Sequence, residues 1–141
     1  MSDPYAAVVR RLFANPAHAG DLPPGYAVAA VADAGDGRGF SVRLAAAAER
    51  GIVQKLAFRA FGCPHLIAAA ETACEECEGR PVAALASFAV PPLLERLAVP
   101  VEKTGRILLL EDALRTLAGR LAGNETGPHL TKKDRTREYG D

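Results

Sequence analysis

One stretch of the chain, residues 56–71, changes from the pattern of a strand to the pattern of a helix within a few residues. Apolar residues alternate with small or charged ones from 56 to 60, which is typical of a half-buried strand. A helical pattern follows at once, and Pro64 is suited to the first turn of that helix. The chain is therefore expected to fold with Cys63 on a strand-to-helix turn.

A cysteine on such a turn has surroundings that favour the thiolate. The first backbone N–H groups of a helix have no partner within the helix, and the helix dipole is positive at that end. Both features stabilise negative charge on sulfur, and a protonated His65 would add to the effect. The sequence thus predicts a reactive or metal-binding thiol at Cys63, with a cysteine that has no role as the alternative.

Three apolar segments separated by short turns predict an antiparallel sheet, because parallel strands need a long crossover. The expected strands are residues 26–32, 40–44 and 52–61, and the expected turns between them are residues 33–39 and 49–51. Asp33 and Asp36 are interpreted first as turn-forming residues, since aspartate side chains bond readily to nearby backbone N–H groups.

The remaining periodic segments predict helices. They comprise residues 4–14, 64–78, 82–86, 91–97 and a long last helix that ends at Gly123-Asn124. Together with the sheet they give an α+β fold, with the helices packed mainly on one face of a three-stranded antiparallel sheet. We expect one domain over residues 1–123 and a disordered polar tail over residues 124–141.

Composition excludes several classes of function. Lys plus Arg and Asp plus Glu number 17 each, so the chain has no net charge that would attract nucleic acid or an anionic membrane. No apolar stretch approaches the ~20 residues that span a bilayer, and no secretory signal is recognisable. Three cysteines do not suggest a disulfide framework, which favours a cytoplasmic location.

Three segments together resemble one known family. Residues 15–20 are similar to a motif Asn-Pro-x-x-x-Gly, and residues 51–63 to a third strand followed by a central cysteine turn. Residues 101–113 are similar to a motif Val-Lys-x-x-Cys-Ser-x-Leu-x-x-(Glu/Asp)-Ala. The family is that of the U-type iron–sulfur cluster scaffolds, which comprises IscU, SufU and the amino-terminal domain of NifU, and the resemblance covers roughly residues 5 to 122.

The resemblance implies an iron–sulfur cluster assembly scaffold rather than an enzyme. Cys63 would receive sulfur or bind a cluster, an iron ion or a zinc ion, and the implied metal ligands are Cys63, Asp36 and His65. The implied partners are a cysteine desulfurase and an assembly chaperone, and a homodimer is left open. The surface implied for partner binding comprises Pro100, Val101 and Lys103.

Two of the three cysteines of this family are absent from the chain. Ala34 stands at the position of the family's first cysteine, and Arg106 stands at the position of its third cysteine. A cation at that position opposes a divalent metal, yet it would pair well with the thiolate of Cys63 or with Asp36. A second hypothesis is therefore a pseudo-scaffold, which binds the assembly partners without holding a cluster.

The other cysteines do not complete a site with Cys63. Cys74 follows Cys63 by 11 residues on the same helix, which is about 16 Å at 1.5 Å per residue. Cys74 and Cys77 are interpreted as small buried hydrophobic residues. A third hypothesis, an enzyme with Cys63 as nucleophile and His65 as base, lacks a third group to orient the base.

Further expectations concern charged residues. Glu71, Glu75 and Glu78 are assigned to the solvent-exposed face of the helix that follows Cys63. His18 and His129 fall in a loop and in the polar tail, and both are expected to be solvated.

Overall fold

The computed structural model describes residues 7–22 and 29–126. Its elements are α1 (Ala7–Ala14), β1 (Ala29–Gly35), β2 (Ser41–Glu49), β3 (Ile52–Phe61), α2 (Pro64–Cys77), α3 (Ala83–Ser87), α4 (Pro91–Arg96), the 3-10 turn η1 (Val101–Lys103) and α5 (Thr104–Thr126). Within these ranges, no helix combines the length and the apolar character that crossing a membrane requires.

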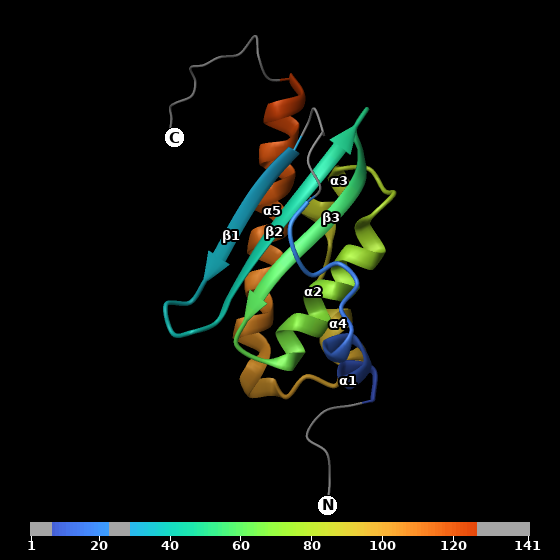
Figure 1. The fold of residues 1–141 in the computed structure, drawn as a ribbon. Helices are drawn as coiled ribbons and strands as arrows, with labels where there is room; N and C mark the ends of the chain where they lie inside the picture. Colours follow the sequence, from blue (N-terminus) through green and yellow to red (C-terminus); the bar gives the residue numbers. More distant parts are fainter. Residues whose placement is uncertain (1–6, 23–28, 127–141) are drawn as a thin grey trace, which may run out of the picture.

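The three strands form one antiparallel sheet in the order β1-β2-β3, as the sequence predicted (Figure 1). A two-residue turn, Arg50-Gly51, joins β2 to β3, and both residues have positive φ, at 55° and 78°. Positive φ at both positions matches the right-handed twist of the flanking strands in a tight hairpin. The predicted α+β fold is confirmed.

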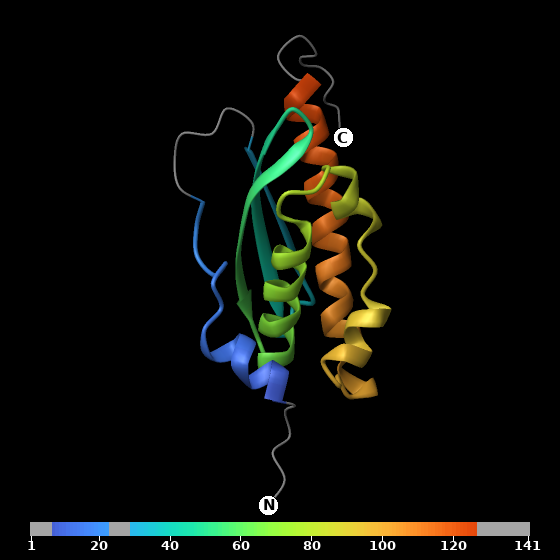
Figure 2. The ribbon, with the colours of Figure 1, turned by 90° about the vertical axis from the view of Figure 1, so that its right-hand side faces the viewer.

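The helices cover one face of this sheet, and the opposite face is turned away from them (Figures 1 and 2). Helix α5 packs against β1 and β2, while α2 packs against β3. Side chains alternate between the faces of a strand, and Ala32, Leu44 and Phe58 lie opposite one another in the register and are buried. These residues form the floor of the core.

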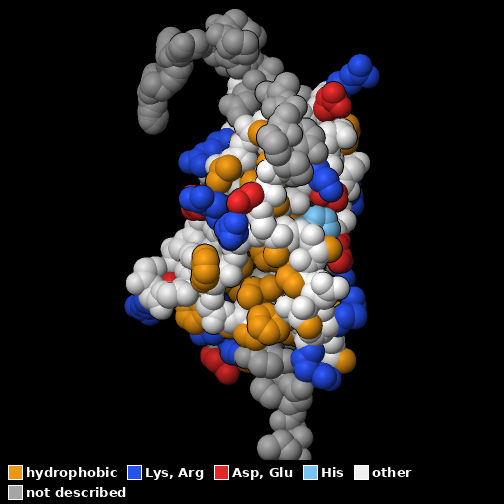
Figure 3. Space-filling model, in the orientation of Figure 1, with side chains coloured by type: hydrophobic (Ala, Val, Ile, Leu, Met, Phe, Trp, Pro, Cys, Tyr) orange, Lys and Arg blue, Asp and Glu red, His pale blue; other side chains and the backbone are white. Residues whose placement is uncertain are grey.

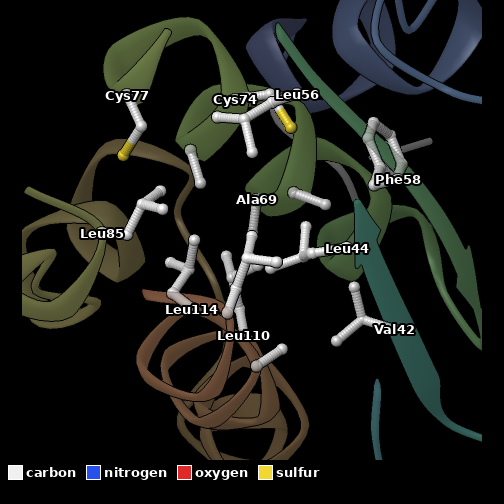
Figure 4. Packing of buried hydrophobic residues seen from close by; sticks show 14 of the residues in the cluster. Val42, Leu44, Leu56, Phe58, Ala69, Cys74, Cys77, Leu85, Leu110 and Leu114 are labelled. Carbon is white, nitrogen blue, oxygen red and sulfur yellow. The ribbon is translucent and has the colours of Figure 1, made fainter. Parts of the chain in front are cut away.

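The core fills the space between the sheet and the two long helices (Figure 4). Leu110 and Leu114 of α5 and Leu44 of β2 are completely or almost completely buried. Burial of each leucine contributes about 1.5–3 kcal/mol to stability. The α2 side of the core is built from alanines at 68–70 and 73, whose small side chains let the helix lie close to the sheet.

Both outer strands of the sheet have partners along part of their free edge. Arg120 of α5 donates a hydrogen bond of 2.6 Å to the backbone oxygen of Val31 in β1. On β3, Phe58 N–H donates to His18 O at 3.0 Å, and Gly20 N–H donates to Phe58 O at 2.8 Å. Covered edges offer fewer free N–H and C=O groups to the strands of other molecules.

The first strand differs from the prediction. β1 runs through Asp33 to Gly35, so Asp33 is a strand residue and not a turn residue. It lies opposite Arg43, whose Nε donates to Asp33 Oδ1 at 2.7 Å. An ion pair across neighbouring strands suits an exposed sheet face, and a pattern read along a single strand does not reveal it. Residues 26–28 of the predicted strand lie outside the described residues.

Two elements are longer than predicted. β2 continues through the alanines 45–48 to Glu49, and three of them are buried although they point to alternate faces. Burial on both faces removes the alternation that marks a strand in sequence. Helix α5 continues through Gly123 to Thr126, because glycine lowers helix stability without ending the helix. The rest of the predicted tail, residues 127–141, lies outside the described residues, as do residues 4–6 of the first predicted helix.

Candidate functional site

Cys63 lies on the strand-to-helix turn that the sequence predicted. It is the residue immediately before α2, with extended backbone angles of φ −157° and ψ 158°. Its backbone oxygen accepts hydrogen bonds from Leu66 N–H at 3.1 Å and from Ile67 N–H at 3.2 Å, which fixes the first turn. Its side chain makes no capping bond to the helix, and the residue is 8% exposed. The thiol is thus sheltered at the amino end of α2.

The residue before this cysteine is in close contact with an aromatic ring. Gly62 has φ +132°, and a Cβ atom at this position would lie 2.1 Å from Cδ1 of Phe40. The guanidinium carbon of Arg106 lies 3.9 Å from the centroid of the same ring, on the first turn of α5. Gly62, Phe40 and Arg106 therefore form a stack beside Cys63, called the Phe40 stack below.

His65 is completely buried in the first turn of α2. Its Nδ1 lies 3.4 Å from Nζ of Lys103, the last residue of η1. Burial lowers the pKa of His65, and the positive charges of Lys103 and Arg106 lower it further. The imidazole is therefore neutral near pH 7, and the expectation that its positive charge assists the thiolate of Cys63 is wrong.

Asp36 serves the turn between β1 and β2. Its Oδ1 accepts hydrogen bonds from the backbone N–H of Arg38 at 2.7 Å and of Phe40 at 3.2 Å. The bond from Arg38 is the main cause that holds the pKa of Asp36 below its usual range. The predicted role as a turn former is confirmed, and the Arg106 guanidinium lies on Phe40 rather than on this carboxylate.

The donor set at the turn is poor for a metal ion. Within the part of the chain that the structure describes, no group of three or more His, Cys, Asp or Glu side chains is arranged to hold a metal. Cys63, Asp36 and His65 are all described residues, so they do not form such a group. In the same part of the chain, Arg106 makes no ion pair with a carboxylate, so its charge remains beside the turn.

A cluster of charged groups that the sequence did not predict lies further along the chain from Cys63, where Glu71 and Glu78 meet the loop at His18. His18 Nδ1 is 2.6 Å from Glu71 Oε2, and His18 Nε2 is 3.1 Å from Glu78 Oε1. The backbone N–H of His18 donates to Glu71 Oε1 at 2.8 Å, and Glu71 is 1% exposed. The expectations of a solvated His18 and an exposed Glu71 are wrong, while Glu75 is exposed as expected and His129 lies outside the described residues.

This cluster joins three parts of the fold. Glu78 accepts the backbone N–H of Leu56 in β3 at 2.8 Å, so α2, β3 and the loop at His18 share one network. Burial opposes a charge on His18, but the hydrogen bonds and charges of Glu71 and Glu78 outweigh it and raise the pKa of His18. One sequence signal was available, since glutamates seven residues apart lie on one helix face.

Cys74 and Cys77 behave as buried hydrophobic residues, as predicted. They are 1% and 2% exposed, and Figure 4 shows them among the apolar side chains of the core. Burial raises the pKa of Cys77 to about 11 and raises that of Cys74 well above its usual value. The thiolate, which is the reactive form, is therefore scarce at both positions.

Cys74 and Cys77 are expected to resist alkylation in the folded protein. At pH 8, a thiol whose pKa is about 11 is ionised in about one molecule per thousand. Iodoacetamide labelling followed by peptide mass spectrometry should modify both residues only after urea is added. The Cys63→Ser variant provides the control without the third thiol. Rapid native labelling of Cys77 would contradict the buried assignment.

The surface proposed for partners has a mixed character. Val101 is 88% exposed at the start of η1, whereas Pro100 is half-buried and Lys103 reaches inward to His65. Val101 borders a shallow hollow of about 530 Å³ next to α4, lined by Pro91, Pro92, Leu94, Glu95, Val99, Val101 and Thr104. The structure thus leaves Val101 available for contact and directs Lys103 to His65.

A second apolar surface lies near the end of β3, where this strand meets α1, its following loop and α2. Figure 3 shows apolar side chains gathered in the lower half of the face seen in that view. Phe61, two residues before Cys63, is 64% exposed, and Phe13 of α1 is 45% exposed. Both line a hollow of about 230 Å³ together with Ile67 and the loop before β1. This surface is suited to contact with another protein.

The chain is similar in sequence and fold to a group of known proteins. The family described as NifU-like N terminal domain matches residues 4–123. The NifU-like protein (N-terminal) of Brucella abortus has a similar fold, with 17% identity over 83% of this chain and 93% of that one, and a TM-score of 0.64. No curated protein sequence matches the chain.

A protein of Fervidobacterium islandicum AW-1 also has a similar fold. It is named as an iron-sulfur cluster assembly scaffold protein for the SUF system. It shares 13% identity with this chain, and the match covers 81% of this chain and 96% of that one, with a TM-score of 0.64.

Proposed function

Because this chain belongs to the NifU-like N-terminal domain family, we propose that it acts in iron–sulfur cluster assembly as a scaffold-like protein that receives sulfur on Cys63. The observation that carries the proposal is the position of this thiol at the amino end of α2, without a capping bond. All three cysteines are buried, but Cys63 precedes α2 and is 8% exposed, whereas Cys74 and Cys77 lie within the helix and are 1% and 2% exposed. A cysteine desulfurase is the proposed sulfur donor.

The transfer needs only a thiolate and a persulfide donor. The Cys63 sulfur attacks the outer sulfur of the donor persulfide, the donor S–S bond breaks, and the donor leaves as its thiolate. The transferred sulfur keeps its proton or loses it to water, so Cys63 ends as a persulfide. Cys63 immediately precedes α2, and the amino end of a helix is the positive end of its dipole, which favours negative charge on a nearby sulfur.

The cluster itself enters this proposal only as cargo. Structural and cluster sites in proteins use several thiolate or imidazole ligands. Within the described residues, no group of three or more possible ligands includes Cys63. The described residues of one chain therefore do not supply a complete cluster site, and a cluster at Cys63 would need a second copy or an external thiol such as glutathione to complete its ligands.

Sulfur transfer from a cysteine desulfurase supplied with ³⁵S-cysteine tests the proposal. Radiolabel should appear on the wild-type chain in a non-reducing gel, disappear on reduction, and fall to background in Cys63→Ser. Cys77→Ala is the matched control, because Cys77 is buried in the same helix, and it should keep the label. Label that persists in Cys63→Ser would refute the assignment of the acceptor.

The alternative is a pseudo-scaffold that binds assembly partners without accepting sulfur. The observation that favours it is the pair of exposed apolar residues, Val101 and Phe61. In the same experiment, this alternative corresponds to a chain that co-purifies with the desulfurase, independently of Cys63→Ser, and never acquires label. A small-molecule persulfide donor in a parallel reaction separates poor docking from an unreactive thiol.

A further inference from the structure

The surroundings of Cys63 differ in charge from those of a metal site. A site for iron or zinc collects thiolates, carboxylates and neutral imidazoles, which together offset the charge of the ion. At this turn, the structure instead brings together two cations from the start of α5 and the turn before it, Arg106 and Lys103. The described residues thus do not fit a cluster or a divalent cation at this position.

Contacts fix one of these cations in place. The ring of Phe40 is pressed on one side against Gly62, which adjoins Cys63, and it lies under the guanidinium of Arg106 at 3.9 Å. A guanidinium stacked on an aromatic face loses little of its charge and is held in orientation. Among the described residues, no carboxylate forms an ion pair with Arg106.

Lys103 adds a second positive charge on the same side. Its Nζ lies 3.4 Å from Nδ1 of His65, and His65 is in the first turn of the helix that Cys63 precedes. Asp36, which the sequence offered as an acid for this site, is bonded to the backbone N–H groups of its own turn. The two cations therefore lie on residues that contact the neighbours of Cys63: Arg106 lies on the ring that touches Gly62, and Lys103 lies at His65.

We propose that the Phe40 stack makes Cys63 a carrier of anionic sulfur: Arg106 stabilises the Cys63 persulfide anion and excludes a metal ion from the thiol. The inference rests on the proposed acceptance of sulfur by Cys63 and specifies its chemical form. Arg106 acts here as a positioning residue, since its charge acts on the sulfur without taking part in bond formation. Persulfide sulfur held in this way stays available to a second thiol or to an iron-bearing partner.

The charge of the pocket can be measured with two disulfide reagents on the full chain. Cys63 attacks either reagent, forms a mixed disulfide and releases one reagent thiolate. 5,5′-dithiobis(2-nitrobenzoate) is dianionic, whereas 4,4′-dithiodipyridine is neutral near pH 7. The rate constant for the dianionic reagent divided by that for the neutral reagent therefore reports the local charge. In Arg106→Ala this ratio should fall about fivefold, the size expected of one charge acting across several ångströms near a protein surface.

Conservative and matched variants separate charge from packing. Arg106→Lys should restore most of the ratio, and Arg115→Ala, which removes an exposed arginine of the same helix, should leave it unchanged. The ratio in the wild type should also fall as salt is added, because mobile ions screen the charge. That measurement needs no variant to fold. A ratio that is insensitive to salt and to Arg106 would overturn the inference.

A zinc titration tests whether the thiol excludes a metal ion. Titration of the wild type with zinc ions against a chromophoric chelator should give no binding that depends on Cys63, and binding that is lost in Cys63→Ser would overturn the inference.

Different results would refute the proposed function and this inference. A chain that accepts ³⁵S on Cys63 but shows no effect of Arg106 retains the proposed function and loses this inference. A chain without label loses the function on which the inference rests.

Discussion

Gly62→Ala is expected to be among the most destabilising single substitutions in the fold, with a loss of about 2–6 kcal/mol in the free energy of unfolding. Two effects add. The backbone at φ +132° is one that residues with a side chain rarely adopt, and the new Cβ would meet the Phe40 ring at 2.1 Å. Urea denaturation followed by circular dichroism measures the loss.

Two further variants separate the two effects in Gly62→Ala. Gly51 also has positive φ, at +78°, but a Cβ there would meet nothing within 4 Å. Gly51→Ala should therefore cost only about 1–2 kcal/mol, from backbone strain alone. In a Phe40→Ala background the collision disappears, so adding Gly62→Ala there should cost less than it does in the wild type. Equal costs in both backgrounds would mean that the ring does not limit position 62.

His18→Ala is expected to cost about 3–5 kcal/mol near pH 6, because it leaves the buried carboxylate of Glu71 without its charged partner. The pKa of His18 is raised above about 6.5 in the folded chain, so the stabilising charge is fully present below that pH. It is lost as the pH rises through the raised value. The difference in unfolding free energy between wild type and variant should therefore narrow as the pH rises above about 6.5 and through the raised pKa of His18.

Matched variants test whether the charge of Glu71 is the cause. Adding Glu71→Gln to His18→Ala removes the stranded charge and should recover part of the loss. Arg59→Ala breaks another ion pair that joins the loop at Asp21 to β3, but both partners are exposed, so the unfolding midpoint should stay at the wild-type value. A loss in His18→Ala that grows with pH would contradict the assigned charge states.

The position of Cys63 could be predicted from sequence because all the information is local. The alternation of β3, the glycine and the proline at the first helical turn lie within a few residues of one another. Asp36 could be interpreted for the same reason, since its hydrogen bonds reach only to Arg38 and Phe40. Turn chemistry of this kind depends on neighbours along the chain.

The surroundings of these residues could not be predicted, because they depend on contacts between distant segments. His18 and Glu71 are 53 positions apart, and each one alone has the polar character of a surface residue. The interaction of Arg106 with Phe40 joins the start of α5 to the start of β2. The sequence showed that an arginine, Arg106, replaces the third cysteine of the family. That its guanidinium stacks on the ring of Phe40, which touches the residue before Cys63, could be seen only in the structure.

The hydrogen bond from Arg120 to Val31 spans 89 positions of the chain. During synthesis, the three strands emerge and can pair long before the last turns of α5 exist. For that interval the nascent sheet has an unguarded edge at β1, together with an apolar face that awaits the same helix. The growing chain is thus most exposed to wrong partners after its sheet is complete, and α5 reduces that exposure by packing on β1 and β2 and by bonding to the free edge at Val31.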